Sequence, residues 1–200
     1  MPKLTFKKIL GHLRTVRIHR KWVRYYCFIA GIPWRGLTHD LSKYSPTEFF
    51  ESARYWTGIG SPINEAKKDQ GYSKAWLHHR GRNKHHWAYW ADNFSEDMIV
   101  YPMPKNDFVE MVCDFLAAGR AYRGKEFTYT GERSWWYKDR EEGNKAMNEK
   151  NKRMIDIIFA DLEAAENPML RKLDREIYDI PTPEQLIKSG YIQKVWEANK

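Results

Sequence analysis

Apolar residues recur at helical spacing along most of the chain, beginning near the N-terminus. Over residues 5–30, Val16 and Val23 fall on one face together with His12 and His19, at about 100° per residue. The opposite face carries only polar and cationic positions over most of its length. This pattern predicts a long first helix that buries both histidines and turns a row of cations to solvent, namely Lys3, Lys7, Arg14, Arg17, Lys21 and Arg24.

Local capping signals place further helices. Ser45-Pro46-Thr47-Glu48 reads as a capping box, with Glu48 as its glutamate, and predicts a helix that runs to about residue 56. Apolar residues at helical spacing predict another helix over about 106–122, with Asp114 at the edge of its apolar stripe. Short helical segments are expected over 39–43, 73–79 and 83–90, a further helix over about 147–162, and a last one from Pro181.

One segment has no clear helical pattern. Residues 123–142 are charged, contain glycine and are rich in Trp and Tyr, which predicts a long ordered loop or a weak hairpin. The fold class expected for the chain is therefore all-α. We expect one domain over residues 1–200, a helical bundle with this long Trp/Tyr-rich loop and a C-terminal helical extension over about 140–200.

Composition narrows the class of protein. With 42% apolar and 15% aromatic residues, the 200-residue chain can bury a core of ordinary size. Its longest apolar run, residues 25–34, is too short to span a bilayer, and the N-terminus lacks the features of a secretory signal. We therefore expect a cytoplasmic protein without a membrane partner, and two reduced, packed thiols at Cys27 and Cys113. A net charge of +8 favours an anionic partner.

The histidines are unevenly distributed. All seven lie before residue 87, and among them is the dipeptide His39-Asp40. Imidazoles and carboxylates gathered in one part of a chain are the ligands that a transition-metal site requires. Adjacent His39 and Asp40 can converge on one ion, and an aspartate has two oxygens with which to bridge two ions. The predicted ligands are His19, His39, Asp40, His79, His86 and Asp114, with His12, His78 and His85 as further candidates.

The order of these residues resembles the HD superfamily of metal-dependent phosphohydrolases. His19-Arg20-Lys21-Trp22-Val23 is similar to the opening helix of that superfamily, and His39-Asp40-Leu41-Ser42-Lys43 to its defining dyad. Residues 78–86 resemble the additional histidines of its multinuclear members, and Asp114 the closing aspartate. Over about residues 5–125 the sequence more closely resembles a bacterial and phage HD-like family of unassigned function. The resemblance implies an HD-like metal-binding core over this range.

A function follows from these ligands. One or two divalent ions (Mn, Fe, Co or Zn) would lower the pKa of a bound water, which then becomes a nucleophile toward phosphorus. Asp40 and Lys43 are the candidate catalytic residues, because Lys43 lies one turn after the dyad and can neutralise a phosphate oxygen. The expected substrate is a small anionic phosphate ester such as a nucleotide, whose phosphate is contacted by Arg80, Arg82, Asn83 and Lys84.

Two alternatives remain open from the sequence. The same ligands could hold two irons and activate dioxygen, as in some HD-type oxygenases. The metal could instead be structural, in a module whose basic first helix binds nucleic acid. Nothing in the sequence selects the oligomeric state.

Overall fold

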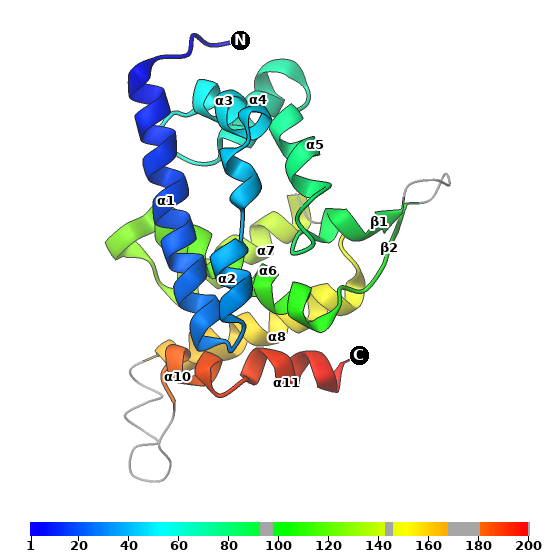
Figure 1. Cartoon of the computed structure of the whole chain (residues 1–200). Coiled ribbons are helices and arrows are strands. Elements are labelled where there is room, and N and C mark those ends of the chain that lie inside the picture. Colours follow the sequence, from blue (N-terminus) through cyan, green and yellow to red (C-terminus); the bar gives the residue numbers. More distant parts are fainter. Residues whose placement is uncertain (93–97, 143–145, 168–180, 200) are drawn as a thin grey trace.

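The computed structural model is all-α, as the sequence predicts. Helices pack around a buried centre, and the only sheet in the described residues has two short strands at the side of the molecule (Figure 1). The structure describes residues 1–92, 98–142, 146–167 and 181–199.

Helix α1 (Phe6–Ile29) is the longest in the described part of the chain and forms one side of the molecule. The Thr5 hydroxyl caps it by accepting a hydrogen bond from the Lys8 N–H at 3.3 Å. His12, Val16 and His19 are buried, while the predicted cationic row is exposed. Both features of the predicted first helix are therefore confirmed.

Short elements follow α1, and several of them form the top of the molecule in Figure 1. They are α2 (Pro33–Thr38), the 3₁₀ turn η1 (Leu41–Tyr44), α3 (Pro46–Tyr55), α4 (Pro62–Gln70), α5 (Lys74–Arg80) and the 3₁₀ turn η2 (Trp87–Trp90). The predicted helix over 45–56 is confirmed as α3, and Ser45 caps it by accepting from the Glu48 N–H. Helix α4 was not predicted, because only Pro62 and Ala66 of its residues are buried and leave little periodicity to detect.

Two predicted short helices are wrong in part. The turn expected over 39–43 is interrupted at Asp40, which has a left-handed φ of 55° and separates α2 from η1. The helix expected over 83–90 begins only at Trp87, as a 3₁₀ turn. Before it, the Asn83 side chain donates to the His79 carbonyl at 2.8 Å, a local bond that competes with helical pairing.

The lower half of the molecule is the core. Strands β1 (Ala91–Asp92) and β2 (Ile99–Val100) pair antiparallel and lead into α6 (Lys105–Arg123), which packs against α1. Helix α8 (Glu149–Glu166), predicted over 147–162, supplies the other large apolar face. Cys27 and Cys113 are free and buried in this core, as expected.

The loop predicted over 123–142 is wrong. After a short 3₁₀ turn, η3 (Gly124–Glu126), the chain forms helix α7 (Tyr129–Glu142), which packs on α8. Trp136 is fully buried, with its ring 5.8 Å from that of Phe115 and its indole N–H donating to Asp156 at 2.7 Å. Tertiary packing of this one face, rather than an apolar stripe visible in the sequence, stabilises the helix.

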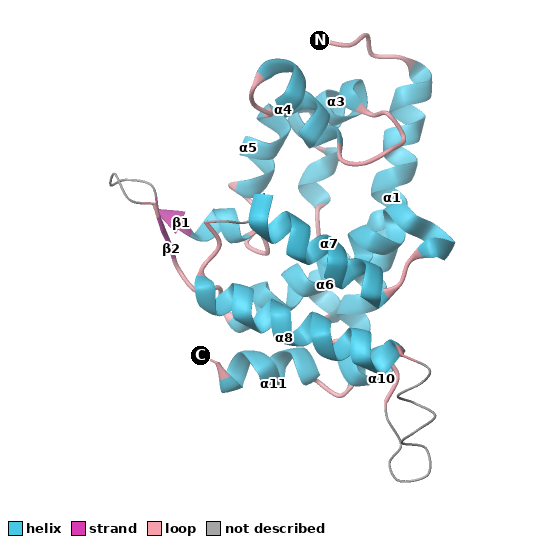
Figure 2. Cartoon of the chain, turned by 180° about the vertical axis from the view of Figure 1, so that it is seen from behind, coloured by secondary structure: helices cyan, strands magenta, loops and turns pink. Residues whose placement is uncertain are grey.

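Two C-terminal helices close the lower face (Figure 2). Helix α10 (Pro183–Lys188) begins with a capping box between Thr182 and Gln185, and α11 (Tyr191–Ala198) follows directly. Ile187 and Ile192 are fully buried against the core, which confirms the expected helical segment from Pro181. No helix in the described residues is long and apolar enough to cross a membrane.

Candidate metal centre

The His39-Asp40 dipeptide lies at the joint between α2 and η1. Because Asp40 is left-handed, the chain reverses there, and both side chains are almost completely buried, at 2% and 1% exposed. Arg20 of α1 secures the joint, since its guanidinium donates to the carbonyls of Leu37 and His39, each at 2.9 Å. A half-buried arginine thus fixes the backbone of His39 and Asp40.

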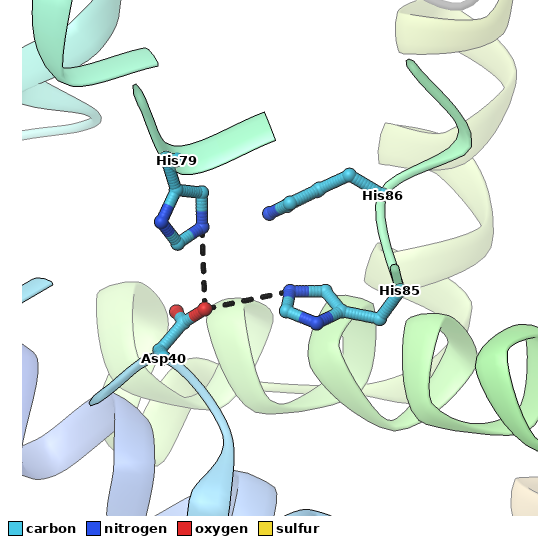
Figure 3. A group of neighbouring side chains, drawn as sticks. All are labelled: Asp40, His79, His85 and His86. Carbon is cyan, nitrogen blue, oxygen red and sulfur yellow. Dashed lines mark ion pairs between the residues drawn. The ribbon is translucent and has the colours of Figure 1, made fainter. Parts of the chain in front are cut away.

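Around Asp40, three groups of side chains could hold a metal ion. Within each group the ligand atoms lie within 4.8 Å of one another, close to the span of about 4 Å that two metal–ligand bonds of about 2 Å allow. Figure 3 shows the first group, in which Asp40 Oδ1 lies 3.2 Å from His79 Nε2 and 3.4 Å from His85 Nε2. The groups are Asp40 with His79, His85 and His86; His19 with His39 and Asp40; and His39 with His85 and Asp114.

The polar tips of these side chains have no hydrogen-bond partner in the described residues. Apart from the ion pair between Lys43 Nζ and Asp40 Oδ2 and the close contacts within the groups themselves, this holds for both carboxylate oxygens of Asp40 and for the Nε2 atoms of five histidines: His19, His39, His79, His85 and His86. Buried polar atoms are almost always satisfied, and leaving one unpaired costs about 1–3 kcal/mol. Seven such atoms gathered around one point fit a site built for a cation.

Two glutamates hold the opposite sides of the rings. Glu48 accepts from His79 Nδ1 at 2.7 Å, and Glu110 accepts from His39 Nδ1 at 2.9 Å and lies 3.3 Å from His85 Nδ1. An imidazole that donates through Nδ1 keeps a free lone pair on Nε2. Carboxylates behind metal-binding histidines orient the rings and raise their basicity in this way.

Glu110 is itself held by a cation. Arg35 Nη1 donates to Glu110 at 2.8 Å and to Asp107 at 2.6 Å, so the guanidinium of α2 is clamped onto the first half of α6. Burial would raise the pKa of Glu110, but its hydrogen bonds to His39 and His85 lower the pKa to about 2. The carboxylate behind the two rings is therefore anionic at neutral pH.

The carboxylates at the centre are anionic as well. Burial alone would raise the pKa of Asp40, but His39 and Lys43 beside it hold the pKa well below its usual range. For Asp114, the neighbouring His19 and His39 overcome the effect of burial in the same direction. Lys43 Nζ lies 2.7 Å from Asp40 Oδ2 and so faces the centre directly.

The structure brings most of the predicted ligands together. His19, His39, Asp40, His79, His86 and Asp114 all belong to at least one of the three groups, and His85 joins two of them. His12 and His78 belong to none. His12 is buried beside Phe49 with both nitrogens unpaired, and His78 donates to Glu48 at 2.6 Å.

The predicted phosphate-binding residues divide into two kinds. Arg80 lines a cavity of about 540 Å³ that adjoins the centre, and Lys43 lines it too. Arg82 and Lys84 are exposed and do not line this cavity, because they lie on the turn outside the His79–His85 pair. Asn83 donates to Ser42 at 2.9 Å and to the His79 carbonyl, which makes it a residue that positions the turn.

Glu48 and Glu110 belong to the candidate site, although the sequence pattern does not predict either of them there. Glu48 was assigned to a capping box, yet its carboxylate bonds His78 and His79 instead of its own helix N-terminus. Asp107, Glu110 and Asp114 recur at intervals of three and four residues on α6, so they share one face. Such an acidic row among the apolar positions of one helix is the sequence pattern that could have predicted Glu110 as part of the site.

Residues 8–161 match the model of a family of unknown function (DUF5662). The chain belongs to this family. The match runs from the start of α1 into α8 and therefore contains every residue of the candidate metal centre, whereas α10 and α11 follow it. No curated protein and no solved structure matches the chain.

Proposed function

We propose that this protein is a metal-dependent phosphohydrolase with an HD-type centre that holds one or two divalent transition metal ions. The observation that carries the proposal is the set of Nε2 and carboxylate atoms that converge around Asp40, with glutamates behind the rings. Asp40 belongs both to the group with His19 and His39 and to the group with the later histidines, so it is the residue able to bridge two ions.

The ligand set fits a borderline metal. Imidazole nitrogens outnumber carboxylates, as in sites for Zn, Fe, Co or Mn, and the arrangement is unlike the all-oxygen sites of Mg or Ca. A divalent ion here would supply Lewis acidity and a nucleophile at neutral pH. Asp40 and Asp114 would offset its charge, and Glu48 and Glu110 would keep the imidazoles in the required orientation.

The cationic side chains beside the centre favour a phosphate ester as substrate. Lys43 faces the centre, and Arg80 and Lys67 line the same cavity. Neither Arg80 nor Lys67 has an acidic partner within the described part of the chain, and the two are close enough for Arg80 to contribute to lowering the pKa of Lys67, after the larger effect of burial. These positive charges can stabilise the phosphate oxygens as negative charge develops on them.

The rest of the cavity favours a substrate with a flat organic group. A volume of about 540 Å³ is in the usual range for small-molecule sites. Its wall carries five aromatic side chains on which a ring can stack, and this combination suits a nucleotide. They are Trp76, Trp87, Phe115, Tyr122 and Trp135.

The first experiment measures metal in purified protein. We expect a transition metal in the wild type, and its loss in His39→Ala and Asp40→Ala with helicity retained by circular dichroism. His78→Gln is the matched control, because His78 shares Glu48 with His79 but belongs to none of the three groups. Full metal occupancy in both ligand variants would overturn the site.

The second experiment is a screen of nucleotides and phosphodiesters with added Mn²⁺. Turnover that is lost with chelator and in Asp40→Ala supports the hydrolase. The competing HD-type di-iron oxygenase uses the same imidazole-rich ligands, and it predicts bound iron with a mixed-valent signal and no phosphate release. That result would replace the proposed reaction while leaving the metal site in place.

A further inference from the structure

The outer face of α1 carries a straight row of cations. Lys7, Arg14, Arg17, Lys21 and Arg24 are exposed and recur at intervals of seven, three, four and three residues, with Lys3 just before the helix. Leu10 and Phe28 occupy the remaining positions of the row and are exposed as well. The helix contains no acidic residue at all.

These cations have no acidic partner in the part of the chain that the structure describes. No ion pair within the described residues involves any member of the row, whereas the other two cations of α1 are used internally. Lys8 donates to the Arg54 carbonyl at 2.8 Å, and Arg20 holds the His39 joint. Like charges three and four residues apart on a helix destabilise it. The row therefore costs stability that an anionic partner would offset.

We propose that this face of α1 binds the phosphate backbone of single-stranded nucleic acid. At a rise of about 1.5 Å per residue, the row from Lys7 to Arg24 extends over about 25 Å, and its last four cations are about 4.5 to 6 Å apart along the helix axis. A linear polyanion with regularly spaced phosphates can neutralise such a row along its whole length, and the released counterions drive the association.

Exposed aromatic side chains at the end of the row favour a single strand. Tyr25, Phe28 and Trp34 are 39%, 71% and 78% exposed, and they lie where α1 ends and α2 begins. Unpaired bases stack on such rings while the backbone follows a positive surface. A lipid surface fits less well, because the middle of the row is cationic and its apolar residues lie toward the ends, whereas a helix that enters a bilayer interface has a continuous apolar face.

The surface is separate from the metal centre. His12, Val16 and His19 are buried on the side of α1 that faces α3 and α6, opposite the row. A nucleic acid bound along the row would not occupy the cavity beside Asp40. The inference therefore holds whether or not the protein hydrolyses phosphate esters.

The test measures binding of a fluorescent oligothymidylate of about 20 nucleotides by anisotropy, across salt from about 50 to 200 mM. The variant is the triple reversal Arg14→Glu, Arg17→Glu and Lys21→Glu. The control is Lys138→Glu, Lys150→Glu and Arg153→Glu, which has the same net charge but changes exposed cations on α7 and α8. Metal content and circular dichroism of both variants establish that each is folded.

We expect tight binding by the wild type and the control, and a loss of about tenfold or more in the α1 variant. The slope of log affinity against log salt should flatten by about two, since each lost contact with a single strand contributes about 0.7. Equal loss in both triple variants would mean that net charge alone drives binding and would overturn the assignment. So would absence of wild-type binding at low salt, or binding to phosphatidylserine vesicles in preference to the oligonucleotide.

Discussion

Glu110 connects two imidazoles of the candidate metal centre to the rest of the fold. It accepts from His39 and lies beside His85, while Arg35 neutralises its second oxygen. We expect Glu110→Gln to weaken metal binding by about 10- to 100-fold, the usual effect of removing a carboxylate behind a metal-binding histidine. Competition with a chromophoric chelator measures this.

The control for that variant is Glu65→Gln, which removes a glutamate paired only with Lys68 on α4. It should leave metal affinity unchanged. If Glu110→Gln bound metal as tightly as the wild type, the rings would have to be oriented by packing alone.

A substitution of Lys43 distinguishes a catalytic role from metal binding. Its ammonium is 2.7 Å from Asp40 Oδ2, yet a lysine retained as a cation is not a metal ligand. Lys43→Met should therefore keep its metal and lose about 2–4 kcal/mol of transition-state stabilisation, the scale for one preorganised charge-stabilising group. Steady-state kinetics on the best substrate of the screen give this value.

Lys68→Met is the matched control, because Lys68 also pairs with an acidic residue three positions away but lies on exposed α4. Its turnover should equal that of the wild type. Unchanged turnover in Lys43→Met would leave Lys43 with only a structural role beside Asp40.

At the scale of elements, Gly36 sets how closely α2 approaches α1. A Cβ at this position would lie 2.8 Å from Cys27 Cβ and 3.0 Å from Arg24 Cα, which is too close for either helix to stay in place. Gly36→Ala should cost about 1–3 kcal/mol of unfolding free energy, as overpacking does. It should also weaken metal binding, because α2 ends directly at His39.

Urea unfolding and metal titration test both effects. Leu37→Ala changes the next residue of α2, whose side chain is 48% exposed, and should shift the unfolding free energy by less than about 0.5 kcal/mol. A Gly36→Ala variant as stable as the wild type would mean that α2 is free to move away from α1 without cost.

Element by element, periodicity located the helices that bury a broad apolar stripe. Helices α1, α6 and α8 belong to this class, and their buried positions follow a helical repeat. Periodicity did not predict helix α7, because its sequence is highly charged and few of its described side chains are buried, with Trp136 the largest of them. Its conformation depends on α8, a neighbour that a local pattern does not contain.

At the scale of the whole molecule, the candidate metal centre joins distant parts of the chain. His19 comes from α1, Asp40 from the joint after α2, His79 from α5 and Asp114 from α6. An ion that binds only this folded arrangement stabilises it by mass action, by about 2.7 kcal/mol at 100 times its Kd. We therefore expect Tm to rise with added Mn²⁺ or Zn²⁺ and to fall with chelator.

Differential scanning calorimetry of Asp40→Ala provides the comparison. This variant lacks the shared ligand, so its Tm should be insensitive to metal and chelator alike. A wild-type Tm that does not change when metal is removed would contradict a site that links the four segments.

The sequence by itself determined the all-α class, the buried and exposed faces of α1, and the set of histidines and aspartates from which the centre is drawn. These depend on residue type and on spacing along one helix, and both are local properties of the chain. Only the tertiary structure decided that His85 belongs to two of the three groups, that His12 and His78 lie outside them, and that Glu48 and Glu110 stand behind the rings. Each of those outcomes depends on the direction of a side chain across a turn or between helices, which local spacing does not encode.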